Sequence, residues 1–420
     1  MKLLLVGNHT CGNRGDAAIL RGLLDTLRTL DANLEIDILS RYSKSSEYLL
    51  GETIIQDPLF DKTIKKKAGA LSTIINKAKN KCLPLVLISH IKKKGVLKAF
   101  PLPQHIREFT QKLKEYDAVI QVGGSFFVDL YGVSQFEHIL CALLANKKIY
   151  LIGHSVGPFE GKNFSRVAKY SFSHVELVQL RERVSYDIMV KYGFDMKNVS
   201  LSVDTAFLVG QNPDESNNYM IHHWSKLISD KKTIAITVRK LAPFDKRLGV
   251  TQDQYESAFA KIIDHYIDLG YQIIAFSTCT GIESYNNDDR IVGLSIKKLV
   301  QNKENYHVVM DELNDLQLGT LFQQCMLTIG TRLHSAIISM NFGTPAIAFN
   351  YEHKSRGVMN ELDMEFLSSD INELITGSVV DKIDHVLENN EDVKNTLAQR
   401  INATRVRGYN NIKEILEGLK

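Results

Sequence analysis

Short apolar segments alternate with amphipathic helical patterns along most of this chain, and this alternation limits the fold more than any other feature. The series begins with an apolar segment at Lys2–Val6, a helical pattern near Asp16–Leu30 and a second apolar segment at Leu34–Leu39. Repeats of strand, helix and strand form parallel sheets that carry helices on both faces. The sequence therefore predicts a doubly wound α/β fold.

A polar segment, Gly210–Asn218, interrupts the alternation with turn-forming residues. A second strand–helix series begins after it, at Thr233–Val238. The 420 residues are also too many for one ordinary hydrophobic core. We therefore predict two doubly wound domains that face a cleft, divided as follows: the first domain at 1–210, a linker at 211–220, the second domain at 221–375 and C-terminal helices at 376–420.

Charge and cysteine content narrow the functional class. A formal net charge of +3 gives no global attraction to nucleic acid. The five cysteines are scattered and form no CxxC pair, so we expect a reducing compartment, without a disulfide framework or structural zinc. The apolar run at Met1–Gly7 is too short for a signal peptide or a membrane span. We expect a cytoplasmic protein.

One region, Asp61–Lys98, departs from the alternation because it holds eleven lysines and no acidic residue after Asp61. It can be a solvated insertion that contains a buried helix. Alternatively, Lys62–Lys98 can present a basic amphipathic face to anionic lipid, which would place the protein peripherally at the inner face of the membrane. Single-stranded nucleic acid is a third partner, but the segment lacks interleaved aromatic residues.

The segment Gly330–Pro345 combines a helix start with residues that bind anions. We expect Thr331 to supply the N-cap hydroxyl, with Arg332 and His334 in the first turn. Free backbone N–H groups and the helix dipole favour an anion there. Arg332 and His334 would diverge by about 200° in a full helix, so they converge on one ligand only if Arg332 still lies in the preceding turn.

The loop Gly7–Asp16 follows the first predicted strand, at the edge where doubly wound sheets bind ligands. Its glycine spacing does not match the dinucleotide motif GxGxxG. Asn13 and Asp16 either cap the next helix or face the cleft, where Asn13 would bind sugar hydroxyls and Asp16 would orient or deprotonate another group.

A second loop, Gly123–Asp129, also follows a predicted strand. Gly124 allows close approach of the backbone to a ligand, and Ser125 can donate a hydrogen bond to it. Asp129 is either a surface cap or a general base. A third loop, Gly153–Pro158, also lies at the end of a predicted strand. Its His154 is either a structural imidazole or a contact to the acceptor.

Arg239 ends the first strand of the second domain within a cluster of four cations. It suits a second anion clamp, and a solvated basic loop is the alternative. Three pairs of residues with metal-ligating side chains have no suitable partners, so we expect no metal site; they are His9 with Cys11, His222 with His223, and Asp288 with Asp289.

Together these motifs resemble the polysaccharide pyruvyl transferase family, and within it the branch that acts in colanic acid biosynthesis. The resemblance covers almost the whole chain. The matching segments are Gly7–Asp16, Gly123–Tyr131, Gly153–Pro158, Arg239–Arg247, Ser277–Arg290, Val308–Asp315, Gly330–Pro345 and Asn350–Gly357. Many relatives carry Gln-Gly where this chain has His154 and Ser155, so acceptor recognition is not carried over at that position.

The resemblance implies two Rossmann-like domains of the GT-B type, with the acceptor on the first and phosphoenolpyruvate on the second. It also implies a cyclic pyruvate ketal on a hexose, expected to be galactose, of an exopolysaccharide repeat unit. Arg332, His334 and Arg239 would contact the phosphoenolpyruvate, with Thr331 beside them. The acceptor can be lipid-linked, and the oligomeric state is open.

Ketal formation requires an acid that protonates the enol methylene and a base that accepts a hydroxyl proton. An imidazole beside a dianion has a raised pKa, so His334 is the candidate acid, while Asp129 or Asp16 is the candidate base. Neither step requires a metal or a further cofactor. The rival hypothesis is a nucleotide-sugar glycosyltransferase of the same fold, for which Glu352 or Glu361 would bind the ribose.

Overall fold

The computed structural model describes residues 1–60, 82–210, 218–350 and 353–419, without the side chains of 284 and 353–355. Every structural statement below refers to these residues. Much of the lysine-rich segment predicted at 61–98, and most of the predicted linker, lie outside them. No helix in the described ranges is both long enough and apolar enough to cross a membrane.

The chain divides into two compact units, each described here by itself. Unit 1 consists of Met1–Thr10, Leu23–Thr205 and Gly408–Lys420, and unit 2 consists of Cys11–Gly22 and Ala206–Arg407. These bounds differ from the predicted division at residue 210. The segment Cys11–Gly22 belongs to the second unit, and the end of the chain belongs to the first.

Unit 1 is built on a parallel sheet with the strand order β3-β2-β1-β4-β6-β7-β8, in which β5 also pairs with β6. Its strands are β1 (Lys2–Asn8), β2 (Glu35–Ser40), β3 (Ile55–Gln56), β4 (Ala118–Gln121), β5 (Gly124–Phe127), β6 (Lys148–Val156), β7 (Leu177–Leu180) and β8 (Val199–Leu201). The order of the strands reverses between β1 and β4. In doubly wound sheets, ligands bind outside the carboxyl ends of the strands at such a switch point.

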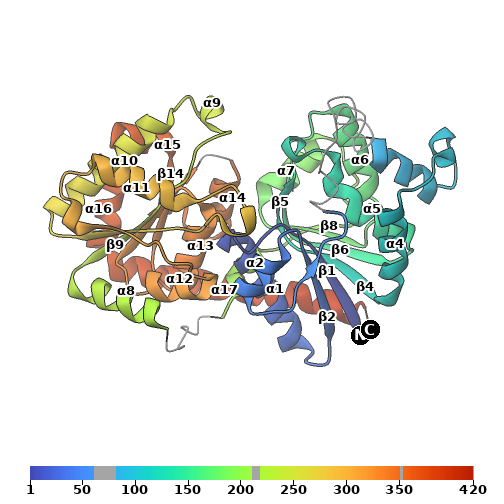
Figure 1. The fold of residues 1–420 in the computed structure, drawn as a ribbon, viewed down its shortest axis with the longest axis horizontal. Coiled ribbons are helices and arrows are strands. Elements are labelled where there is room, and N and C mark those ends of the chain that lie inside the picture. Colours follow the sequence, from blue (N-terminus) through green and yellow to red (C-terminus); the bar gives the residue numbers. More distant parts are fainter. Residues whose placement is uncertain (61–81, 211–217, 351–352, 420) are drawn as a thin grey trace. The chain divides into compact units, whose positions relative to one another are not determined.

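Helices cover the sheet of unit 1 (Figure 1), so its central strands are buried and consist mostly of apolar residues. The longer helices are α1 (Arg14–Leu30, of which 23–30 belong to this unit), α2 (Ser43–Leu50), α4 (Gln104–Lys112), α5 (Glu137–Leu144), α6 (Lys162–Phe172) and α7 (Arg183–Lys191). Residues 82–91 are also helical, and Leu87 and Ile88 lie in the core. This part of the lysine-rich segment agrees with the buried-helix interpretation.

Unit 2 contains a second parallel sheet with the order β11-β10-β9-β12-β13-β14. Its strands are β9 (Thr233–Thr237), β10 (Gln272–Phe276), β11 (Tyr306–Val308), β12 (Leu327–Gly330), β13 (Ala346–Asn350) and β14 (Ser368–Asp370). The order reverses between β9 and β12, which is the switch point of this sheet. The predicted fold of two doubly wound α/β domains is therefore confirmed.

The helices of unit 2 form two layers, one on each face of its sheet. α10, α11 and α15 pack together on one face, and α8, α12 and α13 on the other (Figure 1). Their bounds and those of the remaining helices are α8 (Tyr219–Asp230), α9 (Asp245–Leu248), α10 (Gln252–Asp268), α11 (Asp289–Leu299), α12 (Asp315–Phe322), α13 (Leu333–Asn341), α14 (His353–Glu361), α15 (Ile371–Thr376), α16 (Val379–Glu388) and α17 (Asn390–Glu417).

Candidate functional site

The switch point of unit 2 brings two predicted site segments together. β9 and β12 are neighbours in register, with Thr237 opposite Gly330, so the residues that follow the two strands emerge at one edge. Arg239 follows β9, and Thr331 and Arg332 follow β12. A cation from each strand therefore lies where an α/β sheet commonly binds its ligand.

Arg332 is the N-cap residue of α13, with φ −94° and ψ 115°, and therefore lies outside the helix. The predicted N-cap role of Thr331 is wrong, because its fully buried hydroxyl instead bonds to the Tyr255 hydroxyl at 2.6 Å. The angular divergence expected between Arg332 and His334 applies only to two helical residues. With Arg332 extended, the helix does not force the two side chains apart.

Asp289 fixes the guanidinium of Arg332. Arg332 donates from Nε to Oδ2 at 3.0 Å and from Nη2 to Oδ1 at 2.7 Å, in the two-bond geometry that suits an arginine and a carboxylate. The side chain of Asp289 is 2 % exposed, and its Oδ2 also accepts the backbone N–H of Cys279. In the sequence Asp289 is a candidate only for metal binding, so its role in positioning Arg332 is not predicted.

The loop Cys11–Asp16 is attached to the same unit by Arg14, whose side chain has no exposed surface. Arg14 donates to the carbonyl oxygens of Leu313 and Gly12 at 2.5 and 2.8 Å, and it forms an ion pair with Glu312. Its backbone N–H donates to the carbonyl oxygen of Thr278. These bonds explain why a loop from the start of the chain clusters with the second unit.

His334 lies directly against this loop. A Cβ atom added to Gly15 would lie only 2.5 Å from Cγ of His334, so the imidazole occupies the space that a side chain at position 15 would need. Asn13 accepts the backbone N–H of Gly15 at 3.1 Å, which favours the capping alternative, and the acceptor role of Asn13 remains a prediction. Position 15 must therefore be glycine for the His334 ring to lie where it does.

Asp16 lies in the first turn of α1 and is 8 % exposed. Its charge and that of Arg332 both act on the thiol of Cys279, a residue whose backbone forms a bridge with that of Asn13. Burial raises the pKa of Cys279 to about 12, opposed by the nearby Arg332. The thiol is therefore neutral at ordinary pH and is not an activated nucleophile. The Asp16 carboxyl and the Arg332 guanidinium therefore lie near Cys279, and the His334 imidazole lies against Gly15 of the same loop.

Arg239 and Thr331 share a buried partner, Tyr255. The Tyr255 hydroxyl accepts the backbone N–H of Arg239 at 3.2 Å and bonds to Thr331. The Arg239 guanidinium lies 5.2 Å from the ring centroid of Phe244, and its Nε donates to the Lys240 carbonyl oxygen. The donor-binding roles of Arg239 and Thr331 remain predictions. Because Thr331 is fully buried, it would act on the donor only indirectly.

In unit 1, Asp129 holds a backbone turn. Its carboxylate accepts the N–H of Glu160 at 2.7 Å and that of Gly161 at 3.3 Å, directly before α6. This geometry favours the surface-cap alternative, and the base role of Asp129 remains a prediction.

The three predicted acceptor residues of unit 1 make contacts within that unit, and their acceptor roles remain predictions. Ser125 accepts a hydrogen bond from Arg181 at 2.8 Å, and the space beside Gly124 is occupied by the Phe126 ring rather than left open for a ligand. His154 has no exposed surface, and burial lowers its pKa to about 4. The structural alternative for His154 is favoured over an acceptor contact.

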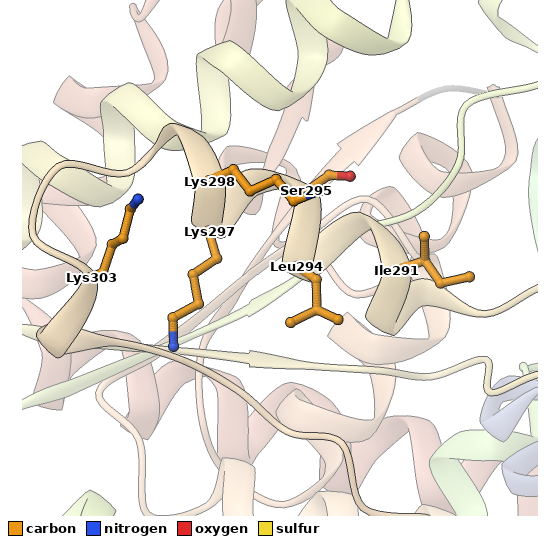
Figure 2. A pocket seen from close by; sticks show the side chains of 6 residues that line it. All are labelled: Ile291, Leu294, Ser295, Lys297, Lys298 and Lys303. Atoms are coloured by element: carbon orange, nitrogen blue, oxygen red, sulfur yellow. The ribbon is translucent and has the colours of Figure 1, made fainter.

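A shallow pocket of about 470 Å³ lies on the outer face of α11 (Figure 2). None of the predicted site residues lines it; the lining residues are Ile291, Leu294, Ser295, Lys297, Lys298 and Lys303. Within the described ranges, no three histidine, cysteine or acidic side chains are grouped to hold a metal ion.

Comparison with known proteins identifies the family of the chain. Residues 13–353 match the family model described as "Polysaccharide pyruvyl transferase". The chain is 52% identical over 419 residues to "Amylovoran biosynthesis protein AmsJ" of Erwinia amylovora, and the match covers 100% of both chains.

Two solved structures show the same architecture at low sequence identity. UDP-GlcNAc 2-epimerase from Neisseria meningitidis, bound to UDP-GlcNAc, has a TM-score of 0.61 at 11% identity and 100% coverage of both chains. Anabaena HepE in complex with UDP-glucose has a TM-score of 0.56 at 13% identity and 99% coverage of both. At these identities the comparison shows the fold alone, that of GT-B glycosyltransferases and epimerases.

Proposed function

Since the chain belongs to the polysaccharide pyruvyl transferase family, we propose that it transfers the pyruvyl group of phosphoenolpyruvate to a hexose of an exopolysaccharide repeat unit. The product is a cyclic ketal in which pyruvate bridges two hydroxyls of one sugar. The name of the amylovoran relative supports an exopolysaccharide acceptor. Within this proposal the sugar is galactose and the polymer is of the colanic acid type.

One observation carries the choice of donor, namely that Arg239 and Arg332 follow the two neighbouring strands at the switch point of one sheet, with His334 in the first turn of the helix that Arg332 caps. Phosphoenolpyruvate has a carboxylate and a phosphate. Two guanidinium groups and the N-terminus of α13 offer charge-assisted hydrogen bonds to both. Asp289 positions Arg332 through two hydrogen bonds that fix the plane of its guanidinium.

The candidate acid and the candidate base both lie at the loop Cys11–Asp16. His334 protonates the methylene carbon of the enol, which makes C2 electrophilic, and a sugar hydroxyl adds to C2. Phosphate leaves, and the second hydroxyl closes the ring. Asp16 is the preferred base, because it shares the unit and the electrostatic surroundings of Arg332, whereas Asp129 already accepts two backbone N–H groups. We propose no metal and no further cofactor, because neither step needs one.

One observation counts against the glycosyltransferase alternative, and it concerns Glu361, one of its two candidate ribose ligands; the other, Glu352, lies outside the described residues and is not tested. Glu361 is already paired with Arg407, whose Nη2 lies 3.4 Å from Oε2.

The test is incubation of the purified protein with a depyruvylated oligosaccharide from the polymer and either phosphoenolpyruvate or a panel of sugar nucleotides. We expect phosphate release with phosphoenolpyruvate and a product whose mass includes a ketal-linked pyruvate. His334→Gln should reduce the rate at least roughly 100-fold while the melting temperature is kept. Release of nucleoside diphosphate with a sugar nucleotide, and none of phosphate, would contradict the proposal.

The proposal extends to a lipid-linked acceptor, with Lys62–Lys98 in peripheral contact with the anionic inner face of the membrane. Replacing the lysines of this segment by glutamine should then weaken the use of a lipid-linked acceptor and leave a soluble oligosaccharide unaffected. Equal use of both acceptors by the variant would remove the membrane contact from the proposal.

A further inference from the structure

A chain of aromatic rings runs along the carboxyl edge of the sheet in unit 1. The ring centroids of Tyr42 and His9 are 5.5 Å apart, those of His9 and Phe126 6.1 Å, and those of Phe126 and Tyr131 6.3 Å. We call these four residues the aromatic surface. None of them belongs to the predicted site or to the chemistry proposed above.

The aromatic surface lies at the switch point of this sheet. His9 follows β1, and Phe126 lies in β5, which follows β4 in the chain. β1 and β4 are the neighbours at which the strand order reverses. Tyr42 follows β2, on the other side of β1. The rings therefore stand where a doubly wound domain binds its ligand.

Local structure holds these rings at the surface. Gly124 has φ +143°, and a Cβ atom there would lie 2.5 Å from the Phe126 ring, so the ring uses the space that a larger residue would fill. Within β5, Phe127 is fully buried in the core while Phe126 is half-buried. Tyr131 is 47 % exposed, and the adjacent Leu130 is 62 % exposed.

Polar groups lie at the edge of the aromatic surface. Arg41 immediately precedes Tyr42, and its Nη2 donates to Oε1 of Gln135 at 2.7 Å. The guanidinium lies 5.4 Å from the ring centroid of Phe60, and that ring lies 5.9 Å from the ring centroid of Tyr42. Rings that are partly exposed beside a guanidinium and an amide suit a ligand with one apolar face and a rim of hydroxyls.

A hexose has these properties, because its axial C–H bonds form an apolar face and its hydroxyls project around the ring. Such a face packs on aromatic rings, while the guanidinium and amide can bond to the hydroxyls. We propose that the aromatic surface, with Arg41 and Gln135 at its edge, binds a hexose unit of the saccharide acceptor. This inference rests on the proposed function and adds the residues that would recognise the acceptor.

The test compares acceptor kinetics in Tyr131→Ala, Tyr131→Phe and a control, Tyr48→Ala. Tyr48 is a 67 % exposed tyrosine on α2 of the same unit. The acceptor is a depyruvylated oligosaccharide from the polymer. We expect the acceptor KM to rise about tenfold in Tyr131→Ala, with no change in the KM for phosphoenolpyruvate, and to stay near the wild-type value in the other two variants.

Saturation-transfer NMR with the same oligosaccharide, in the absence of phosphoenolpyruvate, separates this inference from the proposed function. Sugar signals that appear with the wild type and are lost in Tyr131→Ala support the aromatic surface even if no pyruvyl transfer is found. An active enzyme in which Tyr131→Ala changes neither the acceptor KM nor the sugar signals would overturn it. Melting temperatures of all variants show that each is folded.

Discussion

Arg332 owes its orientation to Asp289 rather than to the helix that follows it. Two hydrogen bonds to a carboxylate that is almost fully buried restrict the guanidinium to one plane. The neighbouring Asp288 performs a different task, because it caps α11 and pairs with Arg290. Adjacent acidic residues therefore differ in role through the direction of their side chains.

Asp289→Asn should lower kcat/KM for phosphoenolpyruvate by roughly 10–100-fold, because an amide cannot accept both guanidinium bonds and Arg332 becomes misplaced. Steady-state kinetics with phosphate release as the signal checks this. Asp288→Asn is the matched control, since asparagine also caps helices and Asp288 does not contact Arg332. Equal losses in the two variants would mean that Asp289 does not position Arg332.

Glu137 gives unit 1 a pH-dependent stability. Burial raises the pKa of this carboxyl to about 8; Arg41 opposes the rise, and Asp57, itself paired with His138, adds to it. Between about pH 4.5 and 8 the unfolded chain loses this proton while the folded chain keeps it. The free energy of unfolding therefore falls over this range as the pH increases.

Glu137→Gln should remove that loss. The unfolding free energy of the variant minus that of the wild type should increase from pH 4.5 to 8, by on the order of a few kcal/mol. Above pH 8 this difference should stay constant. Urea unfolding at pH 5, 7 and 9 measures it. A difference that stays constant across these pH values would show that Glu137 titrates alike in the folded and unfolded chain.

At the scale of elements, α1 shows how one helix takes part in two units. Its first turns, up to Gly22, belong to unit 2, while the rest belongs to unit 1. Arg14 secures the beginning of the helix through fully buried bonds, and Arg21 forms a bidentate pair with Asp315. The apolar periodicity of the helix predicts none of these attachments.

Arg14→Met should destabilise unit 2 by roughly 3–5 kcal/mol, because several buried carbonyl oxygens lose their donor and Glu312 loses one of its partners. Arg28→Met in the same helix is the control. The Arg28–Glu52 pair is largely open to water, so its loss should cost at most about 1 kcal/mol. Urea unfolding of both variants checks the contrast, and similar losses would contradict the role given to Arg14.

At the scale of the whole molecule, the last residues of the chain complete the first unit. Gly408–Lys420 clusters with unit 1, and Ile412, Ile415 and Leu416 are all less than 5 % exposed. Asn411 donates to the Ser202 hydroxyl at 2.9 Å. We expected these C-terminal helices either to pack on the outside or to cross back, and the end of α17 agrees with the second alternative because it is part of the first core.

Ile412→Ala should cost about 2–5 kcal/mol of stability, because it leaves a cavity in the core of unit 1. Lys413→Ala, at an adjacent position whose side chain is 53 % exposed, should change stability by no more than about 0.5 kcal/mol. Thermal and urea unfolding provide the measurement. If the isoleucine variant were as stable as the lysine variant, the end of α17 would not be part of that core.

The sequence by itself determined the parallel α/β architecture, the family and the strand–turn–helix segment that carries Arg332 and His334. These depend on periodicity and on residues close together in the chain, which a sequence displays directly. Only the tertiary structure decided that Asp289 holds Arg332, that Arg14 binds Leu313 across 299 positions, and that His154 is buried. Contacts over such separations depend on how strands are ordered in a sheet, which local periodicity does not encode.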